Sequence, residues 1–75
     1  SCYPNPARAG GIISFNTLVN EGTYYELCDI NGRVVCASVV AANTIQLPLE
    51  IATGVYVLRL HVSESEQRTV KLLIR

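Results

Sequence analysis

Apolar and polar residues alternate along short stretches of the chain, and each stretch is bounded by Gly, Asn, Pro or Ser. An alternation with a period of two places every second side chain on the same side of an extended backbone, which is the pattern of a β-strand with one buried face. No window of about 11 residues carries the i, i+3, i+4 spacing of an amphipathic helix. The pattern therefore predicts strands over residues 12–16, 23–29, 34–40, 44–47, 54–62 and 68–74.

One face of each predicted strand supplies apolar side chains for a core. Ile13 and Phe15 share a face of the first strand, and Tyr25 and Leu27 share a face of the second. About six or seven short strands at near-regular spacing are typical of a two-sheet sandwich, so we expect an all-β fold. In the two longest strands the expected outward residues are Arg59, His61 and Lys71, and the expected inward residues are Tyr56, Leu58, Leu60, Val62, Val70, Leu72 and Ile74.

The five residues Asp-Ile-Asn-Gly-Arg that begin at Asp29 are the sharpest turn signal in the chain, and two hairpin forms fit them. A two-residue turn at Asn-Gly would place Leu27 opposite Cys36. A three-residue loop of Ile-Asn-Gly, with Gly32 in the left-handed region, would place Leu27 opposite Val35. We expect the three-residue loop because it pairs one apolar residue with another.

That hairpin register also sets the expected positions of two of the cysteines. It places Cys28, Val34 and Cys36 on one face, with Cys28 and Cys36 as diagonal neighbours about 7–8 Å apart. This separation exceeds the usual Cα span of a disulfide, so we expect free thiols, with a Cys28–Cys36 bridge as the alternative. Cys2 makes the count three, and an odd count rules out a closed intramolecular disulfide framework. The cysteines and the single His61 do not have the spacing of a zinc site.

Two further local features bear on the fold. In Tyr3-Pro4-Asn5-Pro6 each proline lacks an N–H and fixes its own φ, so we expect this segment to be a rigid extended edge or a turn rather than a central strand. Tyr56 follows a corner glycine, Gly54, at the start of a late strand. This placement favours a tyrosine corner, in which the phenol hydroxyl bonds to the corner backbone; the alternative is a plain core tyrosine.

Length and composition limit the size of the core and the class of partner. The 75 residues support one domain, and 49% hydrophobic against 16% charged residues supply a small core. The formal net charge is zero and the basic residues are scattered, which excludes a positive field for nucleic acid or for an anionic membrane. The chain has no methionine and its first residue is Ser1, so we expect residues 1–75 to be a single domain cut from a longer parent chain.

Candidate catalytic chemistry is sparse in this sequence. Most acidic residues fall in turns or at outward positions, and Asp29 is expected to form its turn by accepting from N–H groups two or three residues further on. Cys28 or Cys36 with His61 would make a nucleophile and a base only if another residue oriented the pair. No phosphate-binding glycine motif or EF-hand spacing is present. We therefore expect no enzyme activity, no cofactor, no metal and no small-molecule substrate.

Four motifs occur in order along the chain. They are Tyr3-Pro4-Asn5-Pro6, then Leu-Cys-Asp-Ile-Asn-Gly-Arg-Val-Val at 27–35, then Ile-Ala-Thr-Gly-Val-Tyr-Val-Leu at 51–58, then Lys71-Leu72-Leu73-Ile74-Arg75 at the end. This ordered set, which ends in an apolar stretch flanked by basic residues, resembles the C-terminal sorting domain of the type IX secretion system (Por secretion system) of Bacteroidetes. The resemblance covers essentially the whole chain.

The resemblance implies an immunoglobulin-like antiparallel β-sandwich of about seven short strands that acts as a C-terminal secretion signal. Such a signal directs a folded cargo protein from the periplasm across the outer membrane, to the cell surface or the medium. The implied partners are the outer-membrane secretion translocon and a sortase-like peptidase, which removes the domain and anchors the cargo to an anionic lipopolysaccharide. An alternative is a retained immunoglobulin-like interaction or adhesion module, or an uncleaved domain of a secretion-machinery component.

The resemblance also names candidate recognition residues. The chain departs from the family at Cys28, where an aromatic residue is common, and in its extra cysteines. The positions that match the family's motifs are Pro4, Asn5, Pro6, Asp29, Gly32, Gly54, Tyr56, Lys71, Leu72, Leu73, Ile74 and Arg75.

Two modes of recognition are open at this stage. A translocon protein could cover an outward apolar patch made of Val34, Val55, Val57 and Leu73. It could instead add a strand at an exposed edge of the last predicted strand, which basic residues 71 and 75 would guard in the free protein. An exposed edge also allows a homodimer or a strand-swapped dimer.

Overall fold

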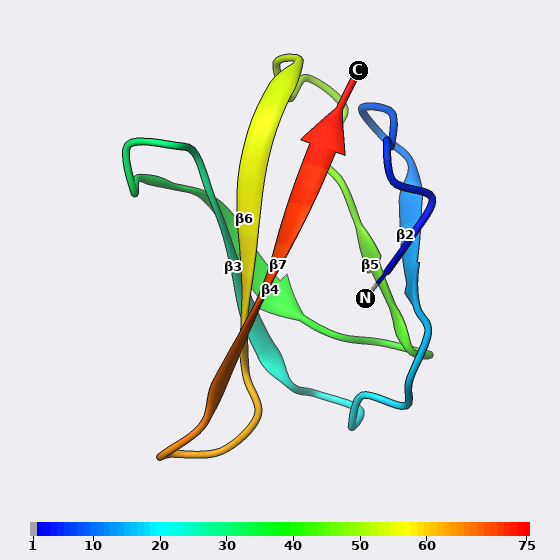
Figure 1. Ribbon diagram of the computed structural model, residues 1–75. Helices are drawn as coiled ribbons and strands as arrows, with labels where there is room; N and C mark the ends of the chain where they lie inside the picture. The colour runs from blue at the N-terminus through cyan, green and yellow to red at the C-terminus, as the bar shows by residue number, and fades with distance from the viewer. Residues whose placement is uncertain (1) are drawn as a thin grey trace.

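The computed structural model describes residues 2–75, which form strands and turns and contain no helix (Figure 1). Within these residues there is accordingly no helix that could cross a membrane. The prediction of an all-β fold with about seven short strands is confirmed. The strands are β1 (Cys2–Tyr3), β2 (Ile12–Phe15), β3 (Tyr24–Cys28), β4 (Val34–Val39), β5 (Thr44–Gln46), β6 (Gly54–His61) and β7 (Gln67–Ile74).

The strands make two antiparallel sheets that pack face to face as a sandwich. One sheet has the order β1-β2-β5, and the other has the order β4-β3-β6-β7. In Figure 1 the three-stranded sheet stands on the right and the four-stranded sheet on the left, with the C-terminus at the top. In this order β4 and β7 are the two edge strands of the larger sheet.

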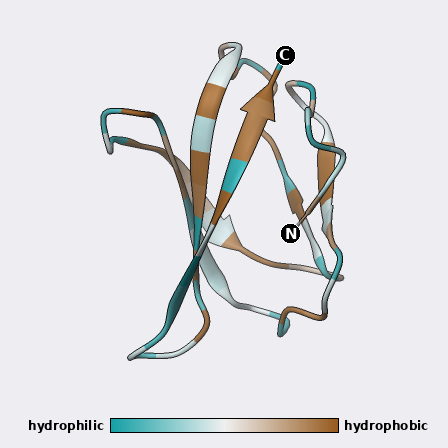
Figure 2. Cartoon of the chain, viewed as in Figure 1, coloured by the Kyte–Doolittle hydropathy of each residue, from teal (hydrophilic) through white to brown (hydrophobic). Residues whose placement is uncertain are grey.

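The core lies between the sheets and follows the alternation of the sequence. Figure 2 shows hydrophobic and more polar residues alternating along β6, and the hydrophobic residues of β7 gathered in its C-terminal half. Val62 and Val70, which we expected to point inward, are only half-buried. β2 and β5 have four and three residues, so they are too short to cover the far ends of the eight-residue strands β6 and β7. The predicted core positions that are buried are Ile13, Phe15, Tyr25, Leu27, Tyr56, Leu58, Leu60, Leu72 and Ile74.

The tip of the β3–β4 hairpin has the three-residue loop that we expected. The Asp29 N–H donates to the Arg33 carbonyl at 2.9 Å, which closes the loop. Gly32 has a φ of 86°, a conformation that costs a residue with a Cβ about 1–2 kcal/mol. A glycine at this point therefore supplies the left-handed residue that the three-residue loop requires.

The register below that tip differs from our expectation. Cys28 lies opposite Val34, but a β-bulge then shifts the pairing and Leu27 lies opposite Cys36. The prediction that Leu27 faces Val35 was wrong. The bulge puts two residues, Val35 and Cys36, against the single partner Leu27, and so both turn toward the core side of the sheet.

The bulge also separates the two cysteines that we had placed on one face. Cys36 packs against the core, whereas Cys28 lies between Val34 and Val57 in the outward row of the sheet. All three thiols are free, as predicted. Burial raises the pKa of the Cys36 thiol, and the nearby Cys28 adds to that rise. Burial likewise raises the pKa of Cys2.

Candidate recognition site

The N-terminal motif lies against the outer edge of the C-terminal strand. Asn5 Nδ2 donates to the Lys71 carbonyl at 2.9 Å, and the Leu73 N–H donates to Asn5 Oδ1 at 3.0 Å. Ala7 extends the contact, because its N–H donates to the Leu73 carbonyl at 2.7 Å and its carbonyl accepts from the Arg75 N–H at 2.8 Å. Two segments more than 60 residues apart are thus joined by four hydrogen bonds.

These bonds close an edge that one of the two recognition modes required to be open. A primary amide offers one donor and one acceptor, so the Asn5 side chain satisfies the two groups that a neighbouring strand would otherwise pair. Pro4 and Pro6 flank it, and neither has an N–H to offer the edge. Over residues 71–75 the last strand is therefore covered, so the alternative of strand addition at a free edge guarded by basic side chains does not hold there.

The C-terminal run contributes to both the core and the surface. Leu72 and Ile74 are almost completely buried, while Lys71, Leu73 and Arg75 are exposed. The backbone of this run carries the Asn5 and Ala7 bonds, and its inward side chains fill the core. A change in the run would therefore affect the fold and the surface together.

The Asp29 carboxylate forms the hairpin turn. Its Oδ1 accepts from the Asn31 N–H at 2.9 Å and from the Arg33 N–H at 3.0 Å, two and four residues further on rather than two or three. Arg33 Nε also lies 3.7 Å from Asp29 Oδ2, but the Arg33 side chain is 83% exposed and such a pair adds little stability. Asp29 therefore has a structural role, as predicted.

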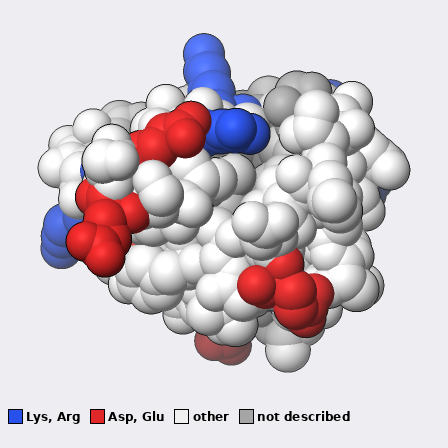
Figure 3. Space-filling view, turned by 90° about the horizontal axis from the view of Figure 1, so that it is seen from below, with Lys and Arg blue, Asp and Glu red and all other residues white. Residues whose placement is uncertain are grey.

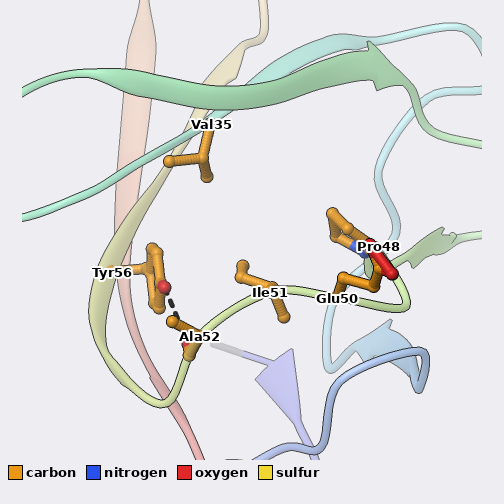
Figure 4. A pocket seen from close by; sticks show the side chains of 6 residues that line it. All are labelled: Val35, Pro48, Glu50, Ile51, Ala52 and Tyr56. Atoms are coloured by element: carbon orange, nitrogen blue, oxygen red, sulfur yellow. Dashed lines mark hydrogen bonds between the residues drawn. The ribbon is translucent and has the colours of Figure 1, made fainter.

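Tyr56 forms the predicted tyrosine corner. Its hydroxyl donates to the Ala52 carbonyl at 2.7 Å, the bond that is dashed in Figure 4. Gly54, at the start of β6, has a φ of 153°, which a residue without a Cβ adopts readily. The bond fixes the loop before β6 to the strand that it enters.

The four motifs meet at one end of the sandwich. Asp29, Gly54 and Tyr56 line a shared hollow of about 300 Å³. Gly54 lies opposite Ile74 in the sheet, and Ile74 in turn bridges to Ala7. In Figure 1 this is the end that carries the C-terminus. Residues that are spread from one end of the sequence to the other therefore form one continuous region.

A comparison with known protein families identifies the family of this chain. The family described as the secretion system C-terminal sorting domain matches residues 1–75. The chain belongs to this family, as a type IX secretion C-terminal sorting domain. A comparison with curated proteins gave no match. Membership implies an interaction with the type IX secretion machinery and delivery to the outer membrane, the cell surface or the medium.

The sorting domain also carries a charged cluster that sequence reasoning missed. Glu26 Oε1 lies 3.1 Å from Arg59 Nη1 and 3.1 Å from His61 Nε2 on the outward face of the larger sheet. Hydrogen bonds from His61 and from Arg59 lower the pKa of the Glu26 carboxyl, although burial partly opposes them. The other ring nitrogen of His61 faces Gln67 at 3.4 Å, and the ring packs against Tyr24. Both ring nitrogens of His61 are thus occupied by groups other than a thiol.

Beside this cluster lie the outward apolar residues of the sorting domain. Val34, Cys28 and Val57 form one row across β4, β3 and β6, and Val55 faces Leu73 in the next row. The four residues of the expected patch thus lie in two adjacent rows, but Cys28 between Val34 and Val57 is only 2% exposed, and Lys71 lies beside Val57. Figure 3, which views the opposite end of the molecule, shows charged side chains in small separate groups. Within residues 2–75 no three His, Cys, Asp or Glu side chains gather as a metal site.

Proposed function

We propose that the secretion machinery recognises this sorting domain by its folded surface. In this proposal it directs a folded cargo protein from the periplasm across the outer membrane through the type IX translocon, which is its direct partner. The observation that carries the proposal is the Asn5 contact with Lys71 and Leu73, because it makes the N-terminal and C-terminal motifs parts of one surface. A linear tag would not need its two ends to be hydrogen-bonded to each other.

The proposal includes removal of the domain from its parent chain by a sortase-like peptidase, with anchoring of the cargo to the cell surface. β1 begins at Cys2 and is already paired with β2. A cut on the N-terminal side of β1 would therefore release cargo and leave every strand of the sorting domain paired. The recognised surface would include the matched motif positions at both ends of the chain.

The test is a fusion of this chain to the C-terminus of a stable reporter in a bacterium with a type IX system. We expect the reporter at the surface or in the medium, and we expect deletion of residues 71–75 to abolish export. A folded, intact fusion that stays in the periplasm would contradict the proposal. Mass spectrometry of the exported reporter separates removal, which gives a product without the domain, from a retained interaction module, which gives an intact C-terminus.

Asn5→Ala is the sharper variant because it leaves every core side chain in place. We expect export of this fusion to fall while the reporter itself stays folded. Asn16→Ala is the matched control, since Asn16 is an exposed residue whose side chain makes no hydrogen bond to residues 2–75. Equal export of the two variants would show that the secretion machinery does not depend on the Asn5 bonds to Lys71 and Leu73.

A further inference from the structure

The strand β4 presents an unpaired edge of unusual composition. It lies at the end of the order β4-β3-β6-β7, and its sequence, VVCASV, contains no charge and no proline. Val34, Val35 and Val39 are each 44–51% exposed. Proteins usually protect an edge strand with charge, proline or a covering segment, because its free N–H and C=O groups can pair with another chain. The edge of β7 has such a cover in Asn5 and Ala7, whereas β4 lacks one among residues 2–75.

The pairing pattern shows which backbone groups of β4 face that free edge. The Val40 N–H donates to the Thr23 carbonyl, so the backbone of Val40 points toward β3. In an antiparallel ladder the direction alternates along the strand. The N–H and C=O groups of Val39 and Ala37 therefore point away from β3, toward solvent.

Next to this edge the molecule has an apolar hollow of about 320 Å³ (Figure 4). The bulge turns Val35 toward it, so the hollow begins at β4 itself. Glu50 stands at its rim, and its carboxylate makes no ion pair or hydrogen bond with residues 2–75. The lining residues are Val35, Pro48, Glu50, Ile51, Ala52 and Tyr56.

We propose that the edge of β4 and this hollow together bind an extended peptide segment of a partner protein by strand addition. The backbone of the segment pairs with Ala37 and Val39. A residue of the segment that faces Ala37 points outward, so its two neighbours point inward, and the neighbour opposite Cys36 lies on the side of Val35 and the hollow. One large apolar side chain fills the hollow, and a Lys or Arg two positions along the segment, on the same inward face, pairs with Glu50 at the rim. Main-chain bonds supply affinity in this mode, and the pockets for alternate side chains supply specificity.

A second copy of the chain fits this site less well than such a segment. If two β4 strands paired about a two-fold axis near Ala37, the inward residues beside it would be Cys36 and Ser38. These side chains are too small to fill the hollow, and neither offers a positive charge to Glu50. The bulge at Val35 would also interrupt a symmetric pairing.

That the partner belongs to the secretion machinery rests on the proposed function. The binding of a peptide segment at β4 can nevertheless be tested without an export assay. The probe is a phage-displayed library of random heptapeptides, selected against the 75-residue chain. We expect enriched sequences to carry an aromatic or Leu side chain with Lys or Arg two positions away, on the same face of the added strand. A synthesised peptide should shift the amide resonances of residues 35–39 and 50–52. No enrichment, or shifts confined to another region, would overturn the proposal.

Two proline variants test the edge itself. Ala37→Pro removes an outward N–H that β3 does not use, and edge positions of this kind tolerate proline. Thr69→Pro is the matched control on the other edge of the same sheet: Leu73 points its N–H outward to Asn5, so by alternation Thr69 does too. We expect Ala37→Pro to weaken peptide binding by about tenfold, the effect of losing one or two main-chain bonds, and Thr69→Pro to leave it unchanged. Thermal unfolding of each variant checks that it is folded.

A variant of Glu50 tests the hollow, and further results would contradict or separate the two proposals. Glu50→Gln should weaken peptide binding and remove the preference for a basic residue two positions from the apolar one. Equal losses in the two proline variants would overturn the assignment to β4, and so would concentration-dependent dimerisation that Ala37→Pro abolishes, because a second copy would then be the occupant. If peptides bind at β4 but the reporter fusion is not exported, the proposed function fails and the binding site stands. If the fusion is exported but no peptide binds at β4, the binding site fails and the proposed function stands.

Discussion

Replacing Asn5 by alanine should destabilise the domain, although Asn5 is exposed and contributes nothing to the core. The change removes the bonds to Lys71 and Leu73, at 2.9 and 3.0 Å. A typical hydrogen bond contributes a net 0.5–1.5 kcal/mol, and water can replace part of each bond at this exposed edge, so we expect a loss of about 1–2 kcal/mol. For a domain of about 60–100 residues this lowers the melting temperature by about 5–15 °C.

The measurement is thermal and urea unfolding followed by circular dichroism, with Asn16→Ala as the control. Amide hydrogen exchange gives a local readout, because the Leu73 N–H loses its acceptor while the core amides keep theirs. We expect faster exchange at Leu73 in Asn5→Ala beyond what the change in global stability accounts for. The reasoning is refuted if Asn5→Ala and Asn16→Ala melt together and the exchange of Leu73 is unchanged.

Three further predictions concern single groups. Tyr56→Phe removes the bond to the Ala52 carbonyl and should cost about 0.5–1.5 kcal/mol of unfolding free energy, measured by urea titration; a neutral result would mean that the corner does not stabilise the fold. The folded pKa of Glu26 is lowered, so its stabilising contribution is present above the unfolded pKa of about 4.3 and is lost as the pH falls through the folded pKa. Wild type should therefore exceed Glu26→Gln in unfolding free energy at pH 7 and lose that advantage near pH 3, and a constant difference would contradict the cluster geometry. The three free thiols should react slowly with a disulfide reagent in the native state and rapidly in urea, because Cys2 and Cys28 are buried and burial raises the pKa of Cys36; rapid native labelling of all three would contradict this.

Several features were determined by the sequence alone because they depend only on neighbouring residues. Alternating apolar residues specified which face of each strand is buried, as Ile13 and Phe15 illustrate. Gly32 and Asp29 specified the hairpin loop, since a positive φ and a short carboxylate act within a few residues. The tyrosine corner at Tyr56 was also predictable, because its partner Ala52 is only four residues away.

Other features were decided only by the tertiary structure. The bulge that sets Leu27 against Cys36 depends on how both sheets pack, because the β4 sequence VVCASV is apolar or small at every position and its alternation does not specify which residues face the core. The pairing of Glu26 with Arg59 required β3 and β6 to be neighbours in the sheet. The reach of Asn5 to Leu73 joins positions 68 residues apart, and local sequence carries no information about which distant backbone a side chain will meet. Periodicity thus specifies faces, whereas register and long-range hydrogen bonds are settled when the sheets close on each other.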